Sequence, residues 1–117
     1  MTAQPPLDGI SVILPCLNEE ASIAQVIAKA RAGIQRLGQP GEILVVDNGS
    51  SDASVRIALE NGARVIHEKN RGYGSALRAG FRQAAHAIIV MGDADLTYDF
   101  ERLDILVQPI LDGQADL

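Results

Sequence analysis

GISVILPCLNEE, residues 9–20, is the stretch that decides the fold, because an apolar, β-branched run reaches Pro15 and a polar turn follows it. Such a run is typical of a buried strand. Asn18 is placed to cap a following helix, and Glu19 and Glu20 suit the positive end of its dipole. The stretch therefore predicts a strand, a turn and the start of a helix.

Outward from this stretch, short apolar runs alternate with segments of helical periodicity along the chain. The expected strands are 9–15, 42–47, 63–67 and 87–91, the expected helices are 23–37, 53–61, 75–85 and 100–111, and residues 115–117 match the opening of a fifth strand. This alternation predicts an α/β fold with a doubly wound, mainly parallel sheet. We expect one domain, residues 9–117, preceded by a disordered arm of residues 1–8.

The composition excludes several classes of function. The 117 residues carry 10 basic and 15 acidic side chains, for a net charge of −5, so the basic stripe that nucleic-acid binding needs is missing. The apolar run 87–91 is far shorter than the ~20 residues that span a bilayer, and the N-terminus lacks the pattern of a signal peptide. The single cysteine, Cys16, allows no internal disulfide and fits a small core residue in a reducing, cytoplasmic setting.

Polar residues gather where three of the expected strands end, at residues 15–19, 47–52 and 93–95. Ligands of doubly wound sheets bind outside the carboxyl ends of the strands. Asp47 or Asn48 alone also suits an Asx turn before a glycine. The three segments together indicate a ligand site at this edge of the sheet.

Asp93 and Asp95 are the most informative of these polar residues. Two carboxylates at this spacing repel each other unless a cation or a proton intervenes. Hard divalent ions such as Mg²⁺ bind one or two carboxylates together with substrate phosphates. The pair therefore indicates a metal–diphosphate site, with a plain surface loop as the alternative.

Binding of a nicotinamide dinucleotide is disfavoured. Its Gly-x-Gly-x-x-Gly fingerprint belongs between the first strand and its helix, where residues 15–19 contain no glycine. Gly72 and Gly74 come later in the chain, and Leu77 stands where the third glycine is needed.

Four stretches, in this order, resemble the N-terminal half of family 2 glycosyltransferases, in particular the polyprenyl-phosphate sugar transferases. They are residues 11–20, 43–52, 70–80 and 90–99. The resemblance implies the Rossmann-like, nucleotide-binding half of a GT-A fold. It also implies that the chain stops before the acceptor part, with a Gly-Ser-Arg segment expected just after Leu117, so that this part alone is inactive.

The resemblance further implies roles for individual residues. The residues implied to bind the base and ribose are Pro15, Leu17, Glu19, Val46, Asp47 and Asn48. Those implied to hold the diphosphate and its Mg²⁺ or Mn²⁺ are Asp93, Ala94 and Asp95, with Asp93 and Asp95 as catalytic residues and Asp95 and Thr97 as metal ligands. Two departures stand out, because relatives usually carry an aromatic residue at the position of Leu17 and an acid at that of Asn48. An amide both donates and accepts hydrogen bonds, so the base, uracil or guanine, stays open.

The implied activity is metal-dependent transfer of a sugar from a UDP- or GDP-sugar to an acceptor, a polyprenyl phosphate, at the cytoplasmic face of a membrane. Two alternatives stay open. Asp93 to Thr97 also match the Asp-x-Asp-x-Thr motif of haloacid-dehalogenase-type phosphatases, with Asp93 as nucleophile, although that motif normally follows the first strand. The other alternative is a nucleotide-binding module without catalysis.

Overall fold

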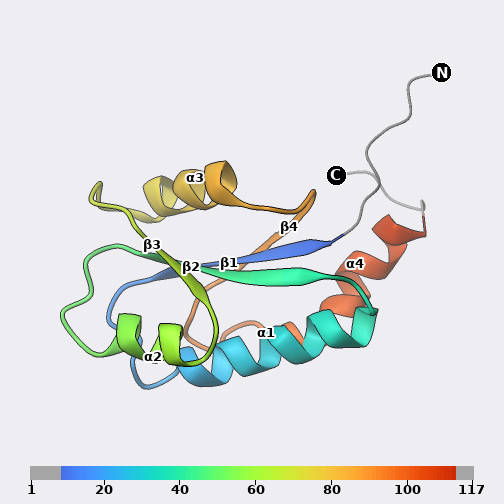
Figure 1. Cartoon of the computed structure of the whole chain (residues 1–117), viewed down its shortest axis with the longest axis horizontal. Coiled ribbons are helices and arrows are strands. Elements are labelled where there is room, and N and C mark those ends of the chain that lie inside the picture. Colours follow the sequence, from blue (N-terminus) through green and yellow to red (C-terminus); the bar gives the residue numbers. More distant parts are fainter. Residues whose placement is uncertain (1–8, 113–117) are drawn as a thin grey trace.

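The computed structural model describes residues 9–112, in which four parallel strands alternate with helices (Figure 1). The strands are β1 (Ile10–Cys16), β2 (Gly41–Asp47), β3 (Arg64–His67) and β4 (Ile88–Met91). The helices are α1 (Ile23–Leu37), α2 (Ser54–Glu60), α3 (Tyr73–Gln83), the 3₁₀ turn η1 (Phe100–Arg102) and α4 (Leu103–Leu111). The strand order is β3-β2-β1-β4, with every pair parallel.

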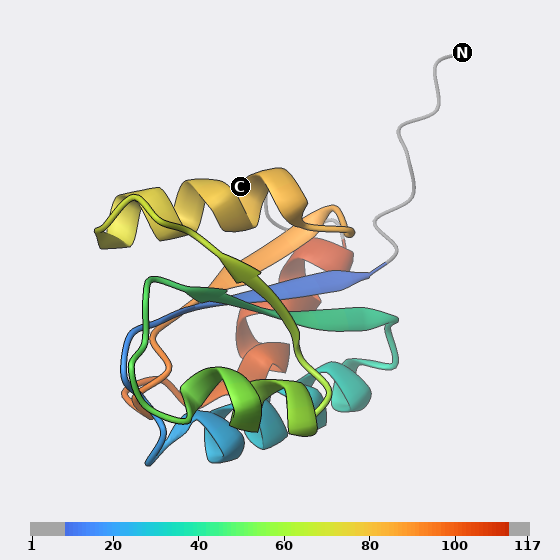
Figure 2. The same cartoon turned by 60° about the vertical axis from the view of Figure 1, so that its left-hand side comes forward.

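Helices cover both faces of this sheet, which confirms the predicted doubly wound α/β fold. In Figures 1 and 2, α3 lies on one face, and α1, α2 and α4 lie on the other. The central strand β1 supplies side chains to both layers, since Val12 and Leu14 belong to the cluster beneath α1 while Ile13 packs with Ala76 and Ala79 of α3. An apolar run buried on both faces is what a central parallel strand requires.

The register of the sheet brings three loops to one edge. Cys16 at the end of β1 pairs with Asp47 at the end of β2. On the other side of β1, Ile13 pairs with Met91, and the Gly92 N–H donates to the Ile13 carbonyl at 3.2 Å. The segments after β1, β2 and β4 are therefore neighbours in space.

One predicted detail of the helices is wrong, and one is refined. Asn18 does not cap α1, because the helix begins at Ile23 and Asn18 itself has a left-handed backbone with φ 55°. The predicted helix 100–111 begins as a 3₁₀ turn, in which Asp99 accepts a hydrogen bond from the Glu101 N–H at 3.1 Å. The expected arm (residues 1–8) and fifth strand (115–117) lie outside the described residues.

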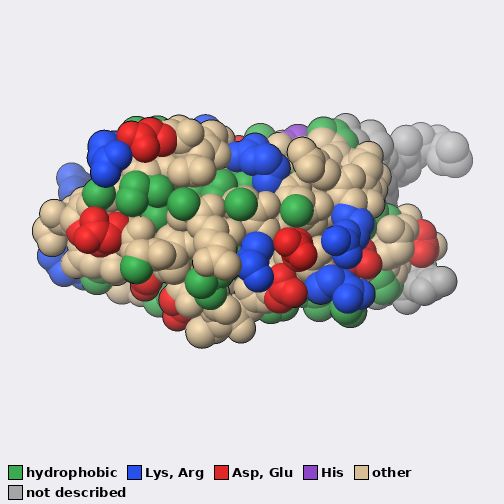
Figure 3. All heavy atoms as spheres, turned by 90° about the horizontal axis from the view of Figure 1, so that it is seen from below, with side chains coloured by type: hydrophobic (Ala, Val, Ile, Leu, Met, Phe, Trp, Pro, Cys, Tyr) green, Lys and Arg blue, Asp and Glu red, His purple; other side chains and the backbone are tan. Residues whose placement is uncertain are grey.

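The molecular surface on the side of α1 carries acidic and basic side chains interspersed with one another (Figure 3). Lys29 of α1 pairs there with Asp99, at 3.8 Å between Nζ and Oδ1. Within residues 9–112, no helix has both the length and the apolar character that crossing a membrane requires.

Candidate functional site

A cavity of about 340 Å³ lies at the carboxyl edge of the sheet. Seven of its lining residues were predicted from the sequence: Pro15, Leu17, Glu19, Asn48, Asp93, Ala94 and Asp95. Five others were not: Cys16, Arg71, Gly72, Tyr73 and Ala76. The structure thus brings together segments that are up to 80 residues apart, as Pro15 and Asp95 are.

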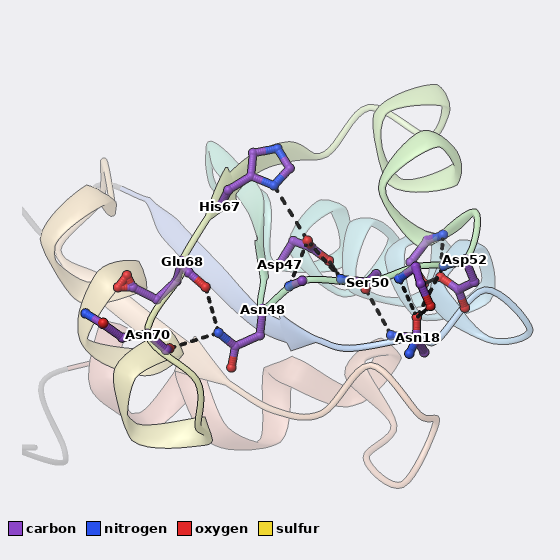
Figure 4. A network of polar contacts seen from close by, with 11 residues as sticks. Asn18, Asp47, Asn48, Ser50, Asp52, His67, Glu68 and Asn70 are labelled. Carbon is purple, nitrogen blue, oxygen red and sulfur yellow. Dashed lines mark hydrogen bonds and ion pairs between the residues drawn. The ribbon is translucent and has the colours of Figure 1, made fainter.

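Hydrogen bonds join the loop after β1 to the loop after β2 (Figure 4). Asn18 Oδ1 accepts hydrogen bonds from the backbone N–H groups of Ser51 and Asp52, at 2.8 and 3.3 Å. The Asn18 N–H donates in return to Ser50 Oγ at 2.9 Å. The Glu19 N–H donates to Ser54 Oγ at 2.8 Å. These reciprocal bonds fix the wall of the cavity that contains Glu19.

Asp47 and Val46 lie outside the cavity lining. The Asp47 carboxylate is buried and accepts from the N–H groups of Gly49 and Ser50, at 3.1 and 3.2 Å, so it shapes the predicted Asx turn. Its Oδ2 also lies 3.6 Å from His67 Nδ1 (Figure 4). Val46 is fully buried in the core beneath α3. Both residues therefore support the loop from behind, and their contact with a nucleotide stays a prediction.

Asn48 is 8% exposed and reaches across to the segment between β3 and α3 (Figure 4). Its Nδ2 donates to the carbonyl oxygens of Glu68 and Asn70, at 2.7 and 3.0 Å. Its Oδ1 accepts from the Gly72 N–H at 2.9 Å. Both amide hydrogens are thus engaged within the protein.

The Asp93–Asp95 turn is held from two sides. Ser22, just before α1, donates its hydroxyl to the Ala94 carbonyl at 2.6 Å. Asp95 Oδ1 accepts from the hydroxyl and the N–H of Thr97, at 2.7 and 3.1 Å, and these bonds hold the pKa of Asp95 below its ordinary value. Asp95 is therefore ionised at neutral pH. Thr97 lies outside the cavity lining, and its role as a metal ligand stays a prediction.

The two carboxylates of the turn suit a hard divalent ion. Neither Asp93 nor Asp95 forms a salt bridge within residues 9–112. The same residues contain no group of three His, Cys, Asp or Glu side chains that could hold a metal. An ion bound here would take further ligands from phosphate oxygens and water, as Mg²⁺ does in many phosphate sites.

Sequence reasoning missed the contribution of the segment before α3. Among the described residues of the lining, Arg71 is the one cation, against the carboxylates of Glu19, Asp93 and Asp95. Tyr73 is half exposed, and partial burial together with the nearby charge of Asp93 raises its pKa. The motif at residues 70–80 carries the signal, but as a dinucleotide fingerprint or as part of the family resemblance it assigns no role to Arg71 or Tyr73.

Cys16, at the end of β1, is 3% exposed although it touches the cavity. Burial raises the pKa of its thiol, which keeps the side chain neutral. This agrees with the expectation of a small core residue.

A second cavity of about 360 Å³ lies at the opposite edge of the sheet, by the starts of β2 and β3. Its charged groups are already engaged with the protein. Glu42 and Arg64 form a salt bridge at 3.0 Å, and Arg31 donates to the Asn61 carbonyl. The cavity at the carboxyl edge is therefore the better candidate site.

Known proteins of one family resemble this chain in sequence and in structure. The family model described as glycosyl transferase family 2 matches residues 11–117. The chain is 44% identical over 108 residues to the low-salt glycan biosynthesis hexosyltransferase Agl6 of Haloferax volcanii, covering 92% of this chain and 26% of that protein. It is 34% identical over 114 residues to the undecaprenyl-phosphate 4-deoxy-4-formamido-L-arabinose transferase of Pectobacterium carotovorum, covering 92% and 35%.

Among solved structures, the chain resembles Mycobacterium tuberculosis glucosyl-3-phosphoglycerate synthase in complex with Mn²⁺, UDP-glucose and phosphoglyceric acid. The TM-score is 0.76 at 32% identity, covering 92% of this chain and 41% of that one. The chain thus spans about a quarter to a half of the length of the relatives that it matches.

Proposed function

Because this chain belongs to glycosyltransferase family 2 and has the nucleotide-binding half of the GT-A fold, we propose that its cavity binds the nucleotide diphosphate of a sugar donor for metal-dependent transfer. The observation that carries the proposal is the meeting of Asp93 and Asp95 with Leu17, Glu19 and Arg71 around one cavity. In this proposal Arg71 binds the diphosphate, Asp95 binds its metal ion and Leu17 contacts the base.

The charges of the lining support the proposed dependence on a metal. Three carboxylates and one guanidinium leave the cavity with net negative charge, which repels a diphosphate. A bound Mg²⁺ or Mn²⁺ supplies Lewis-acid stabilisation of the charge on the diphosphate leaving group. We assign Asp95, whose Oδ1 is held by Thr97, as the ligand of the ion, and Asp93 as the contact to the ribose or sugar.

The remaining residues position the donor. Ser22 holds the Ala94 carbonyl, so the backbone of the Asp93–Asp95 turn is set before a ligand arrives. Leu17 is 44% exposed and offers an apolar surface for the base. Arg71 offers a fixed positive charge to a phosphate oxygen.

For the donor we propose a UDP- or GDP-sugar, and for the acceptor a polyprenyl phosphate at the cytoplasmic face of a membrane. Support for the donor comes from the solved relative in complex with Mn²⁺ and UDP-glucose. Support for the acceptor comes from the relative named as an undecaprenyl-phosphate transferase. A phosphate acceptor is already anionic at neutral pH, so it needs no strong general base.

The phosphatase alternative receives no such support. Its nucleophile motif normally follows the first strand of the domain, whereas Asp93 follows β4. The family match over residues 11–117 favours the transferase.

Titration calorimetry of UDP-glucose, a GDP-sugar and ATP, each with Mn²⁺ and with EDTA, tests the proposal. We expect Mn²⁺ to tighten binding of one of the nucleotide sugars, and ATP to bind more weakly. Asp95→Asn is expected to abolish the gain from Mn²⁺, a loss of roughly tenfold or more, because contacts to charged groups contribute about 1.5–3 kcal/mol. Asp93→Asn is expected to weaken binding and retain part of the metal dependence.

Asp112→Asn is the matched control, since the side chain of this exposed acid, just after α4, is bonded within residues 9–112 only by Gln108, at 2.9 Å. It should leave both the affinity and the metal dependence unchanged. If Asp95→Asn keeps the full gain from Mn²⁺, the assignment of the metal ligand is wrong. If ATP binds as tightly as the nucleotide sugars, the proposed donor class is wrong.

A further inference from the structure

The amide of Asn48 is committed to the protein backbone. An asparagine amide offers two donors on nitrogen and an acceptor oxygen with two lone pairs. In Asn48 both donors go to the carbonyls of Glu68 and Asn70, and the oxygen accepts from the Gly72 N–H (Figure 4 draws the first two). One lone pair is left for any other partner.

The segment that receives these bonds has little other support. The Glu68 N–H donates to the Asp47 carbonyl at 2.8 Å, and α3 begins at Tyr73. Between these points, among the described residues, the backbone of 69–71 makes one hydrogen bond, the one from Asn48 to Asn70. Gly72 adds a backbone with φ 118°, which glycine adopts readily. The path of the segment therefore depends on Asn48.

This segment carries part of the cavity wall. Arg71, Gly72 and Tyr73 all line the cavity, and Arg71 is its one cation within residues 9–112. We infer that Asn48 is a positioning residue, whose amide holds residues 68–72 and so places Arg71 beside the ligand. Asn48 then raises the affinity for the diphosphate and does not affect the selectivity between uracil and guanine. The ligand in this inference is that of the proposed function. The ordering of residues 68–72 by Asn48 does not depend on that function.

The inference explains why an amide stands at this position. An aspartate is isosteric with asparagine, but its carboxylate has no donor and would point at two carbonyl oxygens. The carboxylate could keep only the bond from Gly72. A protonated aspartic acid regains one donor, so the defect should be partly reversed at low pH.

The variants that test this are Asn48→Asp and Asn48→Ala, with Asn70→Asp as the matched control. Asn70→Asp adds the same charge to the segment that Asn48 contacts, while the bond from Asn48 reaches only the backbone of residue 70. The first measurement is the ¹⁵N order parameter of residues 69–71 in the ligand-free protein. We expect it to fall below about 0.6, the range of flexible backbone, in both Asn48 variants and to stay near wild type in Asn70→Asp.

The second measurement is titration with UDP and with GDP in Mn²⁺. Asn48→Asp should weaken both nucleotides by the same factor, roughly tenfold, which corresponds to about 1.4 kcal/mol, and the UDP-to-GDP affinity ratio should stay as in wild type. Lowering the pH through the pKa of the new carboxyl should restore part of the loss in Asn48→Asp and none in Asn48→Ala. Protonation also removes the cost of burying this carboxylate, so the order parameters distinguish the positioning role from a simple loss of stability.

Two results would overturn the inference: order parameters at the wild-type value in both Asn48 variants, or an affinity ratio that shifts severalfold while the segment stays rigid. The second result would make Asn48 a reader of the base. If the wild type binds neither UDP nor GDP, the proposed function fails, and the order parameters still decide the positioning role. Asn48→Ala keeps the test available if the buried charge of Asn48→Asp prevents folding.

Discussion

Replacing Gly92 by alanine should destabilise the protein, because the added methyl group meets a ring that has no room to move. A Cβ built at Gly92 lies 2.5 Å from Cζ of Phe100 and 3.3 and 3.4 Å from its Cε atoms. Phe100 is fully buried and packs edge-on against Tyr98, with ring centroids 4.9 Å apart. The contact links the residue before Asp93 to the layer formed by η1 and α1.

The expected magnitude comes from two opposing effects. Overpacking of this kind costs about 1–3 kcal/mol. Replacing a glycine by alanine stabilises the folded protein by about 0.4–1 kcal/mol, because it reduces the conformational freedom of the unfolded chain. This gain applies at Gly92, which is not among the glycines with a left-handed backbone. We therefore expect a net loss of about 1–2 kcal/mol in the free energy of unfolding, or a fall in Tm of roughly 4 °C or more for each kcal/mol.

Thermal and urea unfolding, followed by circular dichroism, would measure this loss in a double-mutant cycle. Phe100→Leu removes the atoms that clash, so Gly92→Ala should cost at least about 1 kcal/mol less in that background. Gly74→Ala is the control, because Gly74 lies in α3 and its Cβ would meet only the flexible end of Arg78, at 3.5 Å. It should stabilise the protein by up to about 1 kcal/mol. Equal costs of Gly92→Ala in both backgrounds, or no cost at all, would refute the reasoning.

Two further predictions concern charges at opposite edges of the sheet. Burial would raise the pKa of Glu42, but bonds from the Ala85 N–H, from Ser11 and from Arg64 outweigh it and hold the pKa below its ordinary value of 4.5. The stability from Glu42 is therefore present above pH 4.5 and lost as the pH falls through the lowered pKa. Glu42→Gln should lower the free energy of unfolding at pH 7 by about 1–2 kcal/mol, seen as a lower Tm in thermal unfolding. The difference in Tm between the variant and the wild type should shrink below pH 4. Arg71→Gln should weaken UDP binding roughly tenfold in calorimetry, with and without Mn²⁺, whereas Lys69→Gln should not.

Much of the fold was readable from local patterns. Every expected strand and helix within residues 9–112 is present, with boundaries that differ by one or two residues, apart from the 3₁₀ start at Phe100. The period of apolar residues reports which side of an element is buried, and that property belongs to a short stretch of chain. The Asp93–Asp95 pair was likewise visible, because two acids at the end of an apolar run are unusual without a ligand.

The site needed the tertiary structure, because its decisive contacts join residues that are distant in the chain. Asn18 looked like a helix cap, yet its carbonyl oxygen accepts from Ser51 and Asp52 on the neighbouring loop. The family resemblance implies that Asn48 binds the base, which stays a prediction, and the structure adds that its amide is bound to the segment before α3. In both cases the side chain can hydrogen-bond equally well to the partner that was predicted and to the partner in the structure. Sequence alone does not tell which of the two partners is nearer.

The sequence by itself determined the alternation of strands and helices and the acidic turn after β4, since hydrophobic period and turn chemistry act over a few residues. Only the tertiary structure decided the strand order β3-β2-β1-β4 and, through it, which loops share an edge. That order places β2 between β1 and β3, so Asn48 can reach the segment that carries Arg71. Strand order depends on how the two faces of the sheet are covered by helices, which is a property of the whole packed chain and of no single stretch within it.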